Sequence, residues 1–337
     1  MMSSTTIQDV AKIAGVSVAT VSRVLNGSDK VTEETARKVL AVCKELDYSV
    51  NPVAQSLRLG RTNSIAIILP FLTLPSIVER LRGVQAALSD TNYDLIPFSV
   101  GTPKSRDSRL FDLSRKARTD GILIMSMPIS DEQVERLKQK NIPAVLIDSQ
   151  HPKLDRVNVD DHAGGFMVTN HLIGLGHQKI AFISSYFENP LHFSSSLERY
   201  NGYSEALKKA GFFVNPEYQR QGKHGREEAK ILALDLLGSE NPPTAIFASS
   251  DTKAIGVLDA AEQLNIKVPE QLSIVGYDNI RDAEYLNLTT IQQPLFESGL
   301  QGGKKLIQLI ESQYAPLVET ILPLKLVIRG TTAPPQQ

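Results

Sequence analysis

Residues 5–27, TTIQDVAKIAGVSVATVSRVLNG, restrict the possible fold more than any other stretch of the chain. Apolar residues recur there at the spacing of one helix face, at Ile7, Val10, Ala11 and Ala14. Gly15 suits the end of that helix, and Ser17 suits the N-cap of a second helix over 18–26. Two short helices joined by a glycine-containing turn form a helix-turn-helix, a motif whose second helix lies in the major groove of DNA.

A third helix is predicted over 33–46, with Thr32 as its N-cap, and it completes a small core. Its apolar stripe comprises Ala36, Val39, Leu40, Cys43 and Leu46. The chain has one cysteine, Cys43, which excludes an internal disulfide and favours core packing for this residue. We call these three helices the headpiece. A three-helix bundle with no role in DNA binding is the alternative interpretation.

From Ser64 onward, short apolar runs alternate with amphipathic segments. The runs predict strands over 65–70, 94–100, 121–127, 143–148, 179–184, 245–249 and 273–277, and a last strand near 324–328. The segments between them predict helices near 76–90, 105–118, 131–140, 161–175, 197–210, 225–237, 251–264 and 295–312. Because continuous apolar strands joined by helices indicate parallel sheets covered on both faces, the sequence predicts an α/β body of two doubly wound subdomains.

Charge and hydropathy indicate where the protein works. The 337 residues carry a net charge of −1, and the chain shows neither an N-terminal export signal nor an apolar stretch long enough to cross a membrane. We therefore expect a soluble, cytoplasmic protein with no membrane partner. Residues 1–61 contain eight Lys or Arg and six Asp or Glu. A charge of +2 is small for tight DNA binding, since phosphate neutralisation supplies much of the affinity, so two headpieces acting together would help.

The segment from Thr6 to Leu57 resembles the DNA-binding headpiece of the LacI/GalR family of bacterial transcription regulators. The matching residues are Asp9-Val10-Ala11, Gly15-Val16-Ser17, Thr20-Val21-Ser22-Arg23-Val24, Asn26-Gly27, Tyr48, Asn51-Pro52, Ala54 and Leu57. The remainder resembles the periplasmic-binding-protein-like body of the same family, as at Gly174-x-Gly176-His177, Asp251-x-x-Ala254-x-Gly256, Val275-Gly276-Tyr277-Asp278-Asn279 and Gln293-Pro294. The resemblance implies a small ligand in the cleft between the subdomains, which agrees with ligand binding beyond the carboxyl ends of strands in open α/β sheets.

The resemblance also implies a division of the chain. We expect a helix-turn-helix headpiece over 1–50 and a hinge helix with a linker over 51–63. A first body subdomain would comprise 64–160 with about 293–320, and a second 161–292 with about 321–330. The hinge segment is too short to be helical alone. The resemblance implies that it folds on operator DNA, pairs with its dimer mate and enters the minor groove.

For DNA contacts, the resemblance places the first turn of the second helix in the major groove. Val18 and Ala19 offer no hydrogen bonds and would touch a thymine methyl or the groove wall, whereas Arg23 would contact a guanine edge or a phosphate. Leu57 would unstack a central base step; the alternative is a linker residue that packs on the body. The expected DNA-binding residues are Thr6, Ser17, Val18, Ala19, Thr20, Ser22, Arg23, Asn26, Asn51, Ala54, Leu57 and Arg58.

The resemblance implies effector contacts in the body. Arg199 would fork onto vicinal hydroxyls or a carboxylate, and Asp278 would accept bonds from sugar hydroxyls. Asp251 has a second interpretation as a helix cap, and His224 as a solvated loop residue. The expected effector-binding residues are Phe71, Asp161, Phe193, Arg199, His224, Asp251, Asp278 and Gln293.

The kind of effector is suggested by departures from the family pattern. Many sugar-binding members carry Asn and aromatic residues where this chain has Leu74, Ser76 and Ile77, so the platform for a sugar ring is weak on that side unless Phe71 or Phe193 supplies it. Purine-responsive members carry an arginine where Phe193 aligns, which disfavours a purine ligand. We expect a sugar or sugar derivative.

Together these features predict a ligand-responsive repressor of carbohydrate-utilisation genes that binds a pseudo-palindromic operator as a homodimer. One alternative is a solute-binding protein of the transport type, which would begin with an export signal; another is a regulator controlled by a protein partner. No H-E-x-x-H, C-x-x-C or G-x-S-x-G motif occurs, so we expect no catalytic residues, no metal and no cofactor, and therefore no enzyme. The tail after residue 330 has no heptad repeat, so a zipper-type tetramer is not expected.

Overall fold

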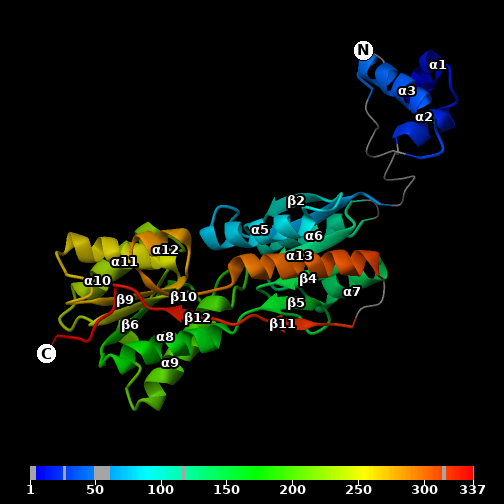
Figure 1. Cartoon of the computed structure of the whole chain (residues 1–337). Helices are drawn as coiled ribbons and strands as arrows, with labels where there is room; N and C mark the ends of the chain where they lie inside the picture. Colours follow the sequence, from blue (N-terminus) through cyan, green and yellow to red (C-terminus); the bar gives the residue numbers. More distant parts are fainter. Residues whose placement is uncertain (1–4, 26–27, 49–60, 116–117, 313–315, 337) are drawn as a thin grey trace. The chain divides into compact units, whose positions relative to one another are not determined.

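The chain divides into two compact units, 1–63 and 64–337, in a computed structural model that describes residues 5–25, 28–48, 61–115, 118–312 and 316–336 (Figure 1). We call the second unit the body. The hinge helix predicted from residue 51 lies outside the described residues. No helix among the described segments is long and apolar enough to cross a membrane.

The headpiece contains the three helices predicted from the sequence: α1 (Ile7–Ala14), α2 (Val18–Leu25) and α3 (Glu33–Glu45). Gly15 ends α1 in the left-handed conformation, with φ of 65°, which a residue without a Cβ adopts at little steric cost. The Ser17 hydroxyl accepts a hydrogen bond from the Thr20 amide at 3.1 Å, and Thr32 caps α3 in the same way. The glycine turn and both cap predictions are confirmed.

The apolar stripe predicted for α3 is wrong at one position. Leu40 is 52 % exposed, whereas Val39, Val42 and Cys43 are buried against α1 and α2. Val39, Val42 and Cys43 lie on the face of α3 that packs against the other two helices, whereas Leu40 lies to one side of that face. Cys43 packs in the core as expected, and burial raises the pKa of its thiol.

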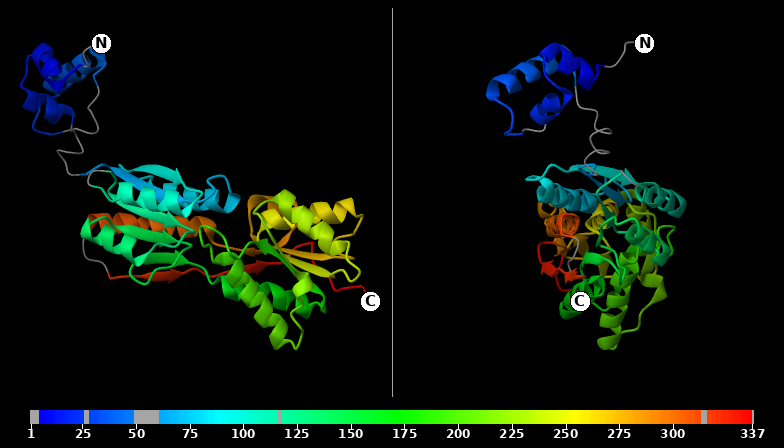
Figure 2. Two further views of the ribbon diagram at one scale, coloured as in Figure 1. Left: turned by 180° about the vertical axis from the view of Figure 1, so that it is seen from behind. Right: turned by 90° about the vertical axis from the view of Figure 1, so that its right-hand side faces the viewer.

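The body contains two six-stranded sheets, each covered by helices on both faces, which confirms the predicted pair of doubly wound subdomains (Figure 2). The first lobe has the strand order β11-β5-β4-β3-β1-β2, and all of its strands are parallel. Its strands are β1 (Ser64–Leu69), β2 (Asp94–Ser99), β3 (Gly121–Met125), β4 (Ala144–Ile147), β5 (Asp155–Asn158) and β11 (Glu319–Ile321). Its helices are α5 (Pro75–Leu88), α6 (Pro103–Leu113), α7 (Asp131–Gln139) and α13 (Leu295–Glu311).

The second lobe has the strand order β12-β10-β9-β8-β6-β7, with β12 antiparallel to its neighbour. Its strands are β6 (Ile180–Ser185), β7 (Gln219–Gly222), β8 (Ala245–Ala248), β9 (Ser273–Asp278), β10 (Thr289–Gln292) and β12 (Lys325–Val327). Its helices are α8 (Asp161–Gly174), α9 (Ser195–Lys209), α10 (Arg226–Leu237), α11 (Asp251–Gln263) and α12 (Arg281–Tyr285), with a 3₁₀ turn at Pro216–Tyr218.

Strands β5, β7, β10 and β11 were not predicted. They are three or four residues long, and polar residues interrupt them, as in DRVN for β5 and QRQG for β7. Backbone pairing with a neighbour, and not an apolar pattern, makes them strands. Among the described residues the chain passes between the lobes after β5, after β10 and between β11 and β12. These passages bring the carboxyl ends of strands from both sheets to one region.

Candidate functional site

The outer face of α2 carries the residues expected to read DNA. Val18 is 41 % exposed, and Ser17, Ala19 and Arg23 are also exposed. Thr20 is half-buried, and its hydroxyl shares a hydrogen bond of 2.9 Å with that of Ser17. The first turn therefore presents small and apolar groups, which fit against a groove wall, and the long polar side chain of Arg23 follows in the last turn of the helix.

Other expected DNA-binding residues have different surroundings. Ser22 is half-buried on the same helix. Thr6 caps α1: its hydroxyl donates to an Asp9 carboxylate oxygen at 2.6 Å and accepts from the Asp9 amide, so the cap uses this side chain within the headpiece. Asn26, Asn51, Ala54, Leu57 and Arg58 lie outside the described residues.

In the body, Arg199 forms the centre of a buried charged cluster. The residue is 7 % exposed, and its Nε lies 2.8 Å from Oδ1 of Asp161. One terminal nitrogen donates to the Ser249 carbonyl at 2.5 Å, and the guanidinium lies 3.8 Å from the centre of the Tyr277 ring. Burial raises the pKa of Asp161, and the nearby Arg199 cation opposes that rise. Two of the predicted effector residues are therefore in direct contact.

Asp278 and Gln293 form a second part of the site, which links the two lobes. Gln293 Nε2 donates to Asp278 Oδ1 at 2.6 Å, and Gln293 Oε1 accepts from Arg80 on α5 at 3.2 Å. Arg80 also pairs with Asp148, at the end of β4, at 3.3 Å. Burial raises the pKa of Asp278 to about 7, although the Arg199 cation acts in the opposite direction. The protonated and ionised forms of Asp278 are therefore both populated near neutral pH.

Asp251 serves the fold of the second lobe. It is fully buried; one carboxylate oxygen accepts from the Thr290 hydroxyl at 2.5 Å and the other from the Ile280 amide at 2.9 Å. These bonds tie β10 and the turn after β9 to the start of α11, whose N-cap is Ser250. Both oxygens are engaged within the protein, which favours a structural role over direct ligand contact, although the helix cap that was the alternative interpretation is made by Ser250 and not by Asp251.

The aromatic residues expected at the site come from both lobes. Phe71 follows β1 and is 45 % exposed, and its ring centroid lies 5.8 Å from that of Phe193, in the segment before α9. His224 is solvent-exposed in the turn between β7 and α10. Surrounding protein nevertheless lowers its pKa, with a further contribution from the cations of Lys253 and Arg199. A side chain that lines a concave surface can be reached by solvent and still have many protein atoms around it, and these atoms reduce the hydration of its charged form.

Sequence reasoning missed Arg80, Asn158 and Lys253. Arg80 and Asn158 are buried, and the Nε of the first and the Nδ2 of the second have no hydrogen-bond partner among the described residues. Arg80 resembles any charged residue of an amphipathic helix; it is buried because α5 packs tightly on α13, where a Cβ at Gly299 would collide with the Arg80 carbonyl. Buried donors without partners are rare and indicate places where a ligand or water bonds.

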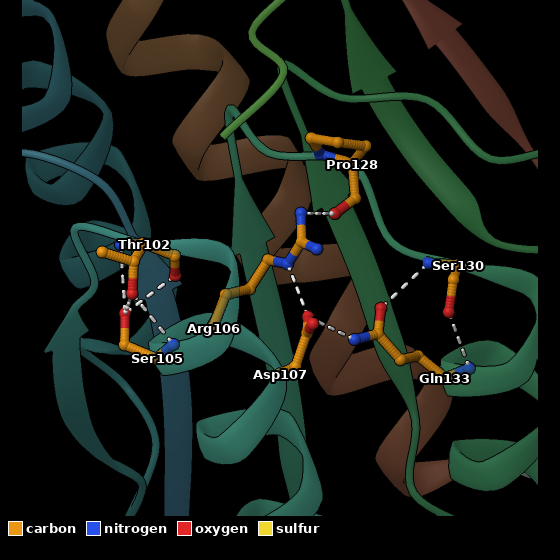
Figure 3. A network of polar contacts seen from close by, with 7 residues as sticks. All are labelled: Thr102, Ser105, Arg106, Asp107, Pro128, Ser130 and Gln133. Atoms are coloured by element: carbon orange, nitrogen blue, oxygen red, sulfur yellow. Dashed lines mark hydrogen bonds and ion pairs between the residues drawn. The ribbon is translucent and has the colours of Figure 1, made fainter. Parts of the chain in front are cut away.

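A polar network in the first lobe joins helices α6 and α7 and the segment that follows β3 (Figure 3). Arg106 on α6 donates to the Pro128 carbonyl at 3.2 Å and to Asp107 at 2.9 Å. Asp107 also accepts from Gln133 on α7 at 2.7 Å, and Ser130 caps that helix. The network connects the segments that follow β2 and β3, at the carboxyl edge of the sheet.

A helix-turn-helix unit joined to a two-lobed α/β body is the domain arrangement of a class of DNA-binding transcriptional regulators. Family models agree: residues 6–51 match "Bacterial regulatory proteins, lacI family", and residues 169–332 match a periplasmic binding protein-like domain. The chain belongs to the lacI family, and it is a DNA-binding transcriptional repressor and not an enzyme.

Individual similarities extend over nearly the whole chain. The chain is 34 % identical to the HTH-type transcriptional repressor PurR of Vibrio vulnificus (strain CMCP6) over 91 % of its own length and 92 % of that protein's. Among solved structures, the lac repressor dimer bound to operator and the anti-inducer ONPF is similar with a TM-score of 0.84 and 27 % identity, covering 98 % of this chain and 100 % of that one. A transcriptional regulator CelR–cellobiose complex is similar with a TM-score of 0.71 and 27 % identity, covering 97 % and 99 %.

Proposed function

We propose that this repressor answers a sugar or sugar derivative bound in the body, at the cluster formed by Arg199, Asp161, Asp278 and Gln293. The observation that carries the proposal is the convergence of buried polar groups at the carboxyl ends of the strands, where open α/β sheets bind ligands: the second lobe supplies the three charged residues, and Arg80 of the first lobe bonds to Gln293. Phe71, Phe193 and His224 would contribute from the border of the same site. The genes under control would be those of carbohydrate utilisation.

The chemistry of the cluster suits a ligand rich in hydroxyl groups. Carboxylates accept hydrogen bonds from hydroxyls, and guanidinium and amide groups donate to hydroxyl oxygens. Arg80 Nε and Asn158 Nδ2 supply two more donors that the described residues leave unused. The CelR regulator, which is similar over nearly its full length, was solved with cellobiose, and that similarity supports the same chemical class here.

We further propose that the protein binds a pseudo-palindromic operator as a homodimer. A headpiece of charge +2 needs a second one for tight binding, and the similar lac repressor is a dimer on its operator. The second lobe offers apolar surface for pairing: Tyr285 is 88 % exposed, and with Leu286 it borders a shallow hollow of about 680 Å³ formed by α10, α11 and α12. The segment 51–63 would form the hinge helix and linker, with Leu57 in the minor groove.

A thermal-shift screen of the full chain tests the effector class. The panel contains cellobiose, D-ribose and other sugars, with adenine and cytidine as non-sugar comparisons. A ligand that binds the folded state at 100 times its Kd raises stability by about 2.7 kcal/mol, which a melting scan resolves easily. Stabilisation by a sugar supports the proposal. Stabilisation by a nucleobase or nucleoside alone, or by no small molecule at all, overturns the sugar assignment and in the last case favours control by a protein partner.

A further inference from the structure

Lys253 is a fully buried lysine, a position that is energetically unfavourable for a charged side chain. It lies in the first turn of α11, its exposed fraction is 0 %, and burial lowers its pKa to about 8. An ammonium group loses hydration when it is buried, and a cation at a helix N-terminus also opposes the helix dipole. A methionine would fill similar space without either penalty. This energetic cost indicates that the ammonium group makes a specific interaction, because packing alone does not require a lysine at this position.

The ammonium group reaches the turn that carries His224. Lys253 Nζ donates to the Lys223 carbonyl at 2.8 Å, and the Lys223 amide donates to a Glu228 carboxylate oxygen at 3.2 Å. Lys253 and Glu228 thus hold both polar groups of the residue that precedes His224. Gly225, which follows, has φ of 139°, a conformation that residues with a Cβ rarely adopt, so this turn depends on a glycine.

The groups around His224 belong to the effector site proposed above. Both Lys253, on α11, and Arg199, on α9, act electrostatically on its ring. Glu228, on α10, offsets part of the Lys253 charge. The geometry links the two residues through the connection from β8 to α11: Arg199 donates to the Ser249 carbonyl in this connection, and Lys253, four residues further on, donates to the Lys223 carbonyl next to His224.

We propose that Lys253 is a positioning residue of the effector site: by holding the Lys223 carbonyl, it fixes the turn that presents His224 beside Arg199. Desolvation by the surrounding protein lowers the pKa of His224 to about 4, and the cations of Lys253 and Arg199 act in the same direction, so the imidazole stays uncharged at neutral pH. A neutral imidazole carries one donor and one acceptor nitrogen, whereas an imidazolium only donates. His224 can then accept a hydrogen bond from one ligand hydroxyl and donate one to another, which suits a hydroxyl-rich ligand. The inference rests on the proposed function for the identity of the site.

The test is an NMR titration of His224 in the full chain, with the signal assigned by the variant His224→Gln. In the wild type we expect a pKa below the ordinary value of about 6.5. Lys253→Met should raise it by about 0.5–1 pH unit, because one facing cation is removed. Lys253→Arg should keep it low. Lys223→Met is the matched control: it deletes an exposed lysine of the same turn but keeps the carbonyl that Lys253 holds, and it should leave the titration unchanged.

Hydrogen exchange gives a second measurement. The amide of Lys223 should exchange about tenfold faster in Lys253→Met than in the wild type, because loss of about 1.4 kcal/mol of local stability changes an opening equilibrium tenfold. An ordinary His224 pKa in the wild type overturns the proposal even if Lys253→Met does not fold. An unchanged pKa and unchanged exchange in a folded Lys253→Met variant overturn it too. Neither measurement needs an effector, so failure of the sugar screen would defeat the proposed function and leave this result separate.

Discussion

The face of α2 that is expected to read DNA and the proposed effector cluster of the body differ in how their side chains are placed. On α2, the side chains are small, exposed and close in sequence, and a contiguous run of eight residues carries them. In the body, charged side chains from α5, α8, α9, β9 and the passage before α13 are buried against one another. Exposed side chains on α2 would form most of their hydrogen bonds with DNA, whereas the buried charged side chains of the body already pair with one another within the protein. We therefore expect substitutions in the two regions to differ in kind as well as in size.

The largest effect is expected at the buried pair of the body. Arg199→Ala leaves Asp161 buried without its cation, and breaking such a pair destabilises a protein by about 3–5 kcal/mol. Chemical denaturation of the body measures the loss. Arg226→Ala is the control, because the Arg226 side chain is 56 % exposed in its ion pair with Asp259, and solvent-accessible pairs contribute about 0–1 kcal/mol. Equal losses for the two variants would show that the Arg199 pair is not a desolvated one.

On the DNA side, Leu57→Ala should weaken binding to the operator by about 1–3 kcal/mol per headpiece and leave non-specific binding unchanged. A wedge acts only where a base step is unstacked, whereas phosphate contacts do not depend on sequence. Titration against operator and scrambled duplexes at one salt concentration separates the two. If both affinities fall together, Leu57 is not a wedge. Unlike the body variant, this one should not change the melting of the free protein.

Asp278 should make the stability of the body depend on pH. Its folded pKa of about 7 exceeds the unfolded value of about 3.9, so its stabilising contribution is present below pH 4 and is lost as the pH rises through 7. Asp278→Asn, which cannot ionise, should lack this loss. Relative to the variant, the wild type should therefore lose about 4 kcal/mol between pH 4 and pH 8. Parallel pH profiles for the two proteins would contradict the shifted pKa.

The smallest effect is expected at the start of α2. Ser17→Ala removes the side chain that accepts from the Thr20 amide, and loss of an N-cap costs about 1 kcal/mol. Thermal unfolding of the headpiece, followed by circular dichroism, reports this loss, and Ser17→Asp should restore the cap. A loss of several kcal/mol would mean that Ser17 supports the headpiece core, and the two regions would then be less different than the structure indicates.

The contrast also explains what could be predicted from the sequence. The headpiece helices, the Gly15 turn and the caps at Ser17 and Thr32 follow from local patterns, because each depends on neighbours within four residues. Leu40 was wrongly predicted to be buried, because packing against the other helices of the bundle, and not the local pattern, decides which residues of α3 are buried. In the body, the alternation of runs predicted two parallel sheets, but β7 and β11 need partner strands far away in sequence to be recognised as strands.

The cluster in the body was predicted in part. The family resemblance identified Arg199, Asp161, Asp278 and Gln293, which the structure brings together in pairs at 2.8 and 2.6 Å. It could not identify Arg80 or Lys253, whose burial arises from the packing of α5 on α13 and of α11 on α10. In a one-dimensional pattern, both look like ordinary charged residues on helix surfaces.

The most direct test of a body that controls a separate DNA-binding unit is operator affinity, measured with and without the sugar that stabilises the wild type most. The wild type should show a ligand-dependent change of about 5- to 150-fold, the usual size of an allosteric coupling. Asp278→Asn should bind operator with the affinity of the ligand-free wild type and show little or no response to the sugar, because it loses a charged contact worth about 1.5–3 kcal/mol. A full response in Asp278→Asn, or a loss of basal operator binding, would contradict this account.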